Sequence, residues 1–427
     1  MHRDGAANNH RGRAESGLEV VAGVGLVERL VAERRDPAVE VWAHLWRTQL
    51  AELTMNTLTL VAGVGAGTLT LGAGLAWLVV AYRFPGRALF EWALILPLAV
   101  PAYVIGFAFL GLFDFAGPVQ SALRQWFGDA ARLPELRSAP GVALMMTLVF
   151  YPYVYLLART AFREQGLATL ETARSLGRSR LRAFFEVVLP MTRRISLVAG
   201  ASLAMMEALA DFGTVSIFGY RTLTEAVYRV WNGMFDRMAA TQLASLLLAF
   251  ALGLLLLERA LRGRRRFTQS QRRGPGVGPV PLRGWSAAAA TVVCGVVLVL
   301  AFVLPIGQLL LWAADVIHGW RVNPDFVAWL GATFLLAGAA AVMICFLGLT
   351  VAYAGRLHPS ASVRFAAQCS SMGYALPGAV IAVGVLAPIA WLDGILGVVA
   401  EWTLGRRLGL LLTGSAFAVL FAYACAF

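Results

Sequence analysis

The sequence contains no lysine, because all 36 of its basic residues are arginine. A nucleotide-binding P-loop needs a lysine to reach the β- and γ-phosphates, and Schiff-base enzymes need a lysine amine. The absence of lysine therefore excludes both a conventional P-loop ATPase and Schiff-base chemistry.

Charged residues, cysteine and histidine are also scarce. Only 14% of the 427 residues are charged, against about a quarter in soluble domains. The four cysteines and five histidines are scattered singly, without the spacing of metal ligands. Since no nucleophile–base or metal constellation is recognisable, the sequence predicts a protein that is not an enzyme and binds no metal or cofactor of its own.

Long apolar runs take the place of the missing charge, and 59% of the residues are hydrophobic. The runs lie at 56–82, 88–113, 140–160, 195–218, 237–258, 284–313, 328–354, 364–391 and 409–427. Each is long enough to cross about 30 Å of hydrocarbon as a helix. The predicted fold is an all-α, polytopic transmembrane helix bundle in a lipid bilayer.

The arginines between these runs predict the orientation. They are concentrated in the segments 161–194 and 259–283 and in the short turns at 83–87 and 356–364. Loops rich in arginine stay in the cytoplasm, so these four segments should share the cytoplasmic side. The same placement explains the net charge of +12 without nucleic acid as a partner.

The chain contains an internal repeat at an offset of 276 residues. The matched pairs include Thr57 and Thr333, Gly72 and Gly348, Trp77 and Tyr353, and Pro101 and Pro377. Six predicted helices, an even number, separate the copies, so the two repeats should have parallel orientation.

The repeat predicts four segments in the chain. They are a polar N-terminal segment (1–50), a first transmembrane repeat (51–260), an arginine-rich cytoplasmic linker (261–283) and a second repeat (284–427). The second repeat is expected to be truncated before its own copy of the 161–194 loop.

The cytoplasmic loop is predicted to form two short helices joined by a sharp bend. Thr169 can cap the first helix, Gly177 can end it in a left-handed conformation, and Ser179 can cap the second. The second helix should be followed by Pro190. Its predicted apolar face consists of Leu181, Phe184, Phe185, Val188 and Leu189.

This loop, residues 171–190, resembles the EAA loop of ABC importer permeases. The matching positions are Glu171, Ala173, Gly177, Leu189 and Pro190, while Thr172 and Val187 depart mildly from the pattern. The resemblance implies that the loop couples the permease to a cytoplasmic ABC ATPase dimer, which binds ATP and Mg²⁺. It further implies a periplasmic substrate-binding protein as partner and a location in the bacterial inner membrane.

Segments 85–107, 110–124 and 208–231 are similar to the duplicated permeases for ferric iron. This resemblance implies import of Fe³⁺, with thiamine or another small solute as the alternative within ABC importers. An ion-coupled secondary transporter is the alternative from a different class, since it too can use parallel repeats.

Two carboxylates, Glu207 and Asp211, are four residues apart and share one face of the predicted helix 195–218. Carboxylates within a membrane commonly mark a transport pathway. We therefore expect them to line the substrate pathway near its outer end, where hard oxygen ligands could meet Fe³⁺. The alternative is a structural role, with both groups satisfied by tyrosine, arginine or backbone partners.

Overall fold

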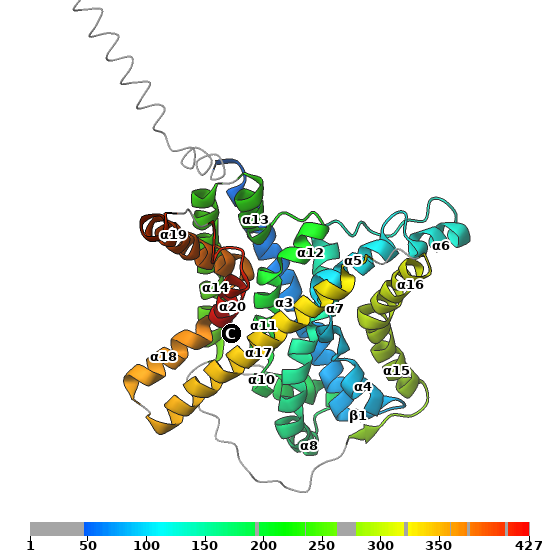
Figure 1. Ribbon diagram of the computed structural model, residues 1–427. Coiled ribbons are helices and arrows are strands. Elements are labelled where there is room, and N and C mark those ends of the chain that lie inside the picture. The colour runs from blue at the N-terminus through cyan, green and yellow to red at the C-terminus, as the bar shows by residue number, and fades with distance from the viewer. Residues whose placement is uncertain are drawn as a thin grey trace, which may run out of the picture.

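The protein is described by a computed structural model that covers residues 47–192, 196–234, 236–262, 279–319, 323–358, 360–373, 376–405 and 409–426. Within these ranges the fold is helical apart from one pair of two-residue strands, and seven helices are long and apolar enough to cross a membrane (Figure 1). The predicted all-α membrane fold is confirmed.

The centre of the bundle is the packing of α3 (Leu50–Ala81) against α7 (Ala139–Ala161) and α11 (Val198–Ala210). Glycines allow these helices to approach closely. A Cβ atom added at Gly72 would lie 2.7 Å from the carbonyl oxygen of Tyr151, and one at Gly200 would lie 2.6 Å from the Cα of Val154. Neither position has room for a side chain.

The predicted helix 88–113 is wrong, because the segment is broken. It consists of α4 (Arg87–Ala93), the 3₁₀ turn η1 (Leu96–Ala99) and α5 (Ala102–Phe113), and the amphipathic helix α6 (Pro118–Phe127) follows. Pro97 and Pro101 lie at the break, where proline removes backbone donors and restricts the preceding residue.

The predicted helix 195–218 is also wrong as a single helix. It ends at Ala210, and α12 (Phe212–Ile217) starts after an extended residue, Asp211. The first half is completed by α13 (Leu223–Gly233) and α14 (Arg237–Arg262).

The second half contains α15 (Trp285–Leu298), the π turn η5 (Val299–Val303), α16 (Leu304–His318), α17 (Phe326–Leu357), α18 (Ala361–Met372), α19 (Gly378–Leu404) and α20 (Ala416–Ala426). The predicted helix 364–391 is wrong for the same reason as 88–113, because α19 begins after Pro377. The predicted span 409–427 is helical only from Ala416 in the described part.

Helix bounds repeat at the predicted offset. The 32-residue α17 begins and ends 276 residues after the 32-residue α3. Pro101 and Pro377 both adopt an extended conformation and directly precede α5 and α19. The repeat is therefore visible in the backbone as well as in the sequence, whereas the four segment boundaries stay predictions.

The arginine-rich turn at residue 83 lies beside the end of the linker, as expected if both are on the same side of the membrane. Strand β1 (Tyr82–Arg83) pairs in parallel with β2 (Val280–Pro281), and the Leu282 N–H donates to the Arg83 carbonyl over 2.8 Å. Residues 1–46 of the predicted N-terminal segment and 263–278 of the predicted linker lie outside the described residues.

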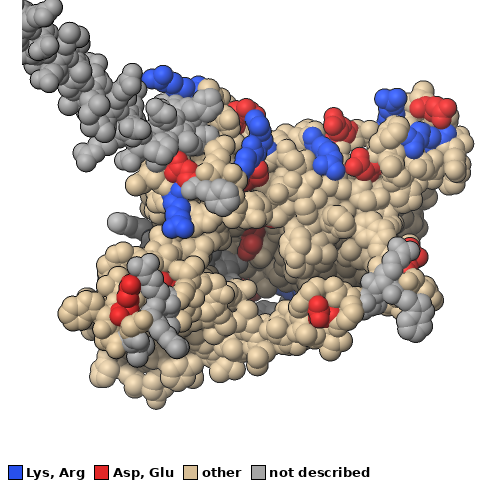
Figure 2. Space-filling view, turned by 45° about the horizontal axis from the view of Figure 1, so that its top comes forward, with Lys and Arg blue, Asp and Glu red and all other residues tan. Residues whose placement is uncertain are grey.

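Charge is unevenly distributed over the surface. Figure 2 shows arginine and acidic residues in a row along the upper rim of the view, above a broad surface that is largely uncharged. Figure 1 places α6, α12 and α13 at this end, and α8 and β1 at the opposite end. A surface with few charges next to a charged rim is what a bundle in a bilayer presents to the lipid.

Candidate functional site: a bent helical loop and a membrane pocket

The loop begins as a continuation of α7. After Ala161 the helix widens into the π turn η2 (Phe162–Gly166) and runs directly into α8 (Leu167–Ser175). The predicted cap at Thr169 is therefore wrong, since the first helix has no separate start there. Movement of α8 would act directly on α7.

Gly177 ends α8 in the predicted left-handed conformation, with φ of 85°. Its N–H donates to the Arg174 carbonyl over 2.9 Å, and the Arg178 N–H donates to the Ala173 carbonyl over 3.2 Å. These two bonds form a Schellman motif, which satisfies the last carbonyls of the helix. A glycine is favoured here because other residues are strained at positive φ.

The return segment consists of α9 (Arg180–Ala183), the π turn η3 (Phe184–Val188) and α10 (Leu189–Thr192). Ser179 caps it as predicted, accepting from the Arg182 N–H over 3.5 Å. Pro190 lies inside α10 rather than after the helix, so that expectation is wrong.

An aromatic cluster joins the return segment to the bundle. The Phe184 ring lies 4.5 Å from that of Trp77 in α3, and the Trp77 ring lies 5.3 Å from that of Phe162. Val188 is also buried. Phe185, predicted on the same face, is exposed because the π turn shifts the helical register.

The predicted loop residues lie in different environments in the structure. Glu171 lies in α8, the Ala173 methyl is buried in the core of the bundle, Leu189 is half-buried, and Gly177 and Pro190 are exposed. Sequence reasoning missed Leu176, whose side chain is 79% exposed next to the bend. A large apolar side chain on a polar loop is the signal that could have identified it.

Glu207 and Asp211 line one pocket of about 310 Å³. The other walls are the broken segment Leu98–Ala102 and the α7 residues Val149, Phe150 and Tyr153. The Tyr153 hydroxyl donates to Oε1 of Glu207 over 3.2 Å. The pocket lies beside the middle of α7.

Asp211 also has a structural role, as the alternative reading expected. Its Oδ1 accepts from the Thr214 N–H over 2.9 Å and its Oδ2 accepts from the Thr214 hydroxyl over 2.5 Å. This is an N-cap of α12. Asp211 lies at the break between α11 and α12, where it caps α12 and also lines the pocket. It therefore has both the structural role and the pocket-lining position.

No cluster of three or more histidine, cysteine or acidic side chains suited to a metal ion occurs in the part of the chain that the structure describes. The pocket offers two carboxylates and a phenol. Oxygen groups of this kind are the ligands that hard cations prefer.

The structure combines broken helices around a polar pocket with a bent helical loop that continues the central helix α7. This combination is that of a membrane transport permease. Residues 68–267 match the family described as "Binding-protein-dependent transport system inner membrane component". This range includes the loop, the pocket carboxylates and most of the first repeat.

The chain is similar to permeases whose names give different substrates. It is 27% identical to the Fe(3+)-transport system permease protein FbpB 2 of Haemophilus influenzae, over 80% of the chain and 64% of that protein. It is 31% identical to the sulfate transport system permease protein CysT of Salmonella typhimurium, over 52% of the chain and 82% of the relative. It is 28% identical to the molybdenum transport system permease protein ModB of Escherichia coli, over 50% of the chain and 91% of the relative.

The chain belongs to the family of binding-protein-dependent transport system inner membrane components. It is thus an inner-membrane permease component of an ABC importer and not itself the catalytic subunit. Membership of this family excludes the alternative of an ion-coupled secondary transporter. The chain spans 64% of the length of its Haemophilus relative.

Proposed function

We propose that this chain is the transmembrane permease of an ATP-driven importer for ferric iron. A periplasmic binding protein delivers the ion, and a cytoplasmic ATPase dimer, which binds ATP and Mg²⁺, drives its passage. The observation that carries the choice of substrate is the pair of carboxylates, Glu207 and Asp211, in the pocket between the broken helices.

Electrostatics favours a cation over the oxyanions that two of the relatives carry. Two carboxylates would repel sulfate or molybdate, and charges interact more strongly in a low-dielectric bundle than in water. The same groups attract Fe³⁺, the ion in the name of the Haemophilus relative.

The bent loop is proposed as the docking element for the ATPase. Leu176 and Gly177 form the exposed tip, whereas Ala173 holds the inner side of α8 against the bundle. In this reading Leu176 enters a groove of the ATPase, and Glu171 lies on the same short helix. Leu189 and Pro190 belong to the return segment that carries movement back into the membrane.

Uptake of radioactive ferric iron tests the substrate. The double variant Glu207→Gln, Asp211→Asn removes both charges while asparagine preserves the cap of α12. With the binding protein and ATPase co-expressed, uptake should fall about tenfold, which corresponds to about 1.4 kcal/mol of lost interaction. Excess sulfate, molybdate or thiamine should not compete with iron in the wild type.

Asp236→Asn is the matched control. Asp236 accepts from the Ala239 N–H over 3.0 Å, so it lies at a helix start as Asp211 does, but it does not line the pocket. This variant should transport iron normally. Normal uptake by the double variant, or competition by an oxyanion, would overturn the assignment of iron.

A further inference from the structure

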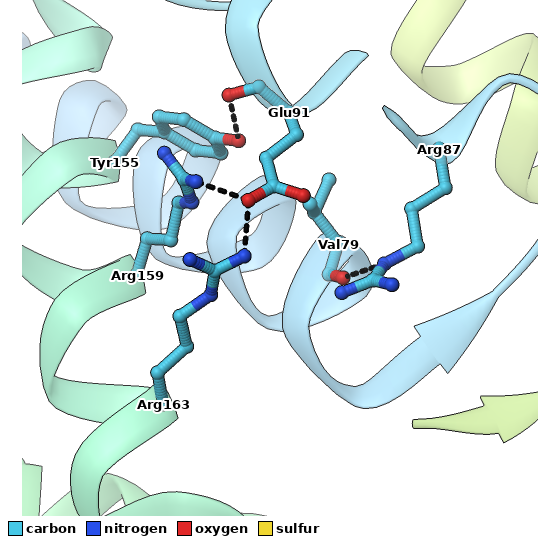
Figure 3. A network of polar contacts seen from close by, with 6 residues as sticks. All are labelled: Val79, Arg87, Glu91, Tyr155, Arg159 and Arg163. Carbon is cyan, nitrogen blue, oxygen red and sulfur yellow. Dashed lines mark hydrogen bonds and ion pairs between the residues drawn. The ribbon is translucent and has the colours of Figure 1, made fainter. Parts of the chain in front are cut away.

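One face of α7, together with the π turn η2 that continues it, contacts a single short segment of the chain through four polar side chains. These four, the α7 stripe, are Tyr151, Tyr155, Arg159 and Arg163. Residues four apart lie above one another on a helix. All four reach the segment 91–94, at the end of α4 and just before the helix break. Figure 3 shows the contacts of Tyr155, Arg159 and Arg163 with Glu91.

The upper part of the stripe binds backbone atoms. The Tyr151 hydroxyl donates to the Leu94 carbonyl over 2.8 Å, and the Tyr155 hydroxyl donates to the Glu91 carbonyl over 3.1 Å. Both tyrosines are fully buried. These two hydrogen bonds fix the position of the segment along the axis of α7.

The lower part of the stripe binds charge. Arg159 and Arg163 both donate to Oε1 of Glu91, as the dashed lines in Figure 3 show. Arg159 is buried, and its Nε has no partner among the described residues. A buried cation of this kind depends on its carboxylate, so loss of Glu91 would leave an uncompensated charge.

The carboxylate is held in its anionic form. Burial acts to raise the pKa of Glu91, but the hydrogen bond from Arg159 and the positive charges of Arg159, Arg163 and Arg87 outweigh it and hold this pKa below its ordinary value. Helix α4 is not one of the membrane-length helices. Arg87 itself donates to the Val79 carbonyl over 2.6 Å, which ties the same short helix to the end of α3.

The two ends of this network lead to the two parts of the proposed site. Arg163 lies within the π turn that continues into α8. At the other end, Leu94 lies four residues before Leu98, which lines the carboxylate pocket together with Val100 and Pro101. The stripe thus links the start of the loop at 162–192 to the chain that leads, four residues later, into the pocket wall.

We propose that Glu91 is a positioning residue that makes α4 and the pocket wall move together with the docking loop. The inference rests on the proposed function, since it requires an ATPase at the loop. When the ATPase displaces α8, Arg159 near the end of α7 and Arg163 in η2 carry Glu91 with them. The chain that follows Glu91 as far as Pro101 then moves, and the pocket that it lines changes shape. Glu91 would touch neither ATP nor substrate.

The test uses the complex of the chain with its ATPase in proteoliposomes, with the binding protein added. Glu91→Gln keeps the side-chain shape and removes the charge. It should retain the bound ATPase and its basal ATP hydrolysis, but stimulation by the loaded binding protein should fall about fivefold or more, the low end of typical coupling between sites. A purely structural role would instead lower the amount of assembled complex and leave the stimulation ratio intact.

Asp114→Asn is the matched control, because Asp114 forms an ion pair with Arg137 over 3.5 Å at the other end of the bundle. It should behave as wild type. Combining Glu91→Arg with Arg159→Glu should restore part of the stimulation by rebuilding the pair with reversed charges. If Glu91→Gln does not assemble, Arg163→Gln decides, since Arg163 is half-exposed and its loss should weaken coupling without unfolding.

The outcomes separate this inference from the proposed function. A wild-type chain that binds no ATPase would overturn the proposed function itself. A wild-type complex that is stimulated normally, together with assembled Glu91→Gln and Arg163→Gln variants stimulated to the same extent, would overturn only the role of Glu91.

Discussion

Helices α3 and α17 are two copies of one element in two different surroundings. They have the same length and corresponding bounds. In the most apolar stretch of each helix, 56% of α3 is buried but only 6% of α17. Helix bounds therefore follow from the local sequence, whereas burial depends on the neighbours, which are α7 and α11 for α3.

The matched positions of the repeat make this comparison testable. Trp77, Gly72 and Thr57 contact other helices, whereas Tyr353, Gly348 and Thr333 lie on a helix that is mostly exposed. For each pair, we expect a substitution to change the free energy of unfolding strongly in the first repeat and weakly in the second.

The largest difference is expected for the aromatic pair. Trp77→Ala removes the ring between Phe162 and Phe184 and should lower the free energy of unfolding by about 3–5 kcal/mol. Tyr353 is 61% exposed, so Tyr353→Ala should change it by about 0.5 kcal/mol or less. Thermal unfolding in detergent, followed by circular dichroism, measures both, and equal losses would break the comparison.

The two glycine-to-alanine substitutions should change the free energy of unfolding in opposite directions. Gly72→Ala forces a methyl against the backbone of Tyr151 and should destabilise by about 1–3 kcal/mol. A Cβ at Gly348 meets no atom of the described residues within 4 Å, and alanine is the better helix former, so Gly348→Ala should stabilise by about 0.5–1 kcal/mol. Destabilisation by Gly348→Ala would show that α17 is packed more tightly in the working protein.

The threonine pair should give the smallest difference. The Thr57 hydroxyl accepts from the buried Leu223 N–H over 3.0 Å, so Thr57→Val should cost about 1–2 kcal/mol by leaving that donor unsatisfied. Among the described residues the Thr333 hydroxyl bonds only within its own helix, to the Trp329 carbonyl, and Thr333→Val should be nearly neutral. The same unfolding assay applies, and a neutral Thr57→Val would contradict the proposed role of this bond.

Much of this architecture was predictable from sequence. The apolar runs located the helices, the repeat offset matched the bounds of α3 and α17, and Gly177 marked the bend of the loop. These features depend on local pattern and backbone chemistry, which a single sequence contains.

The helix breaks and the polar network were not predicted, for physical reasons. Pro97 and Pro101 are visible in the sequence, but proline is ordinary in membrane helices, so its presence did not require a break. Glu91 was overlooked within an apolar run, although a carboxylate there needs a partner. The spacing of Arg159 and Arg163 was the available signal, and only the fold shows that both face Glu91.

The central claim is that the bent loop joins this permease to an ATPase, and co-purification with its cognate ABC ATPase tests that claim most directly. Gly177→Asp should be compared with Gly128→Asp, since both glycines have positive φ and open space around them, but Gly128 follows α6 at the opposite end. We predict that wild type and Gly128→Asp retain the ATPase and that Gly177→Asp loses it. Equal retention by both variants, or no ATPase bound to the wild type, would contradict the account.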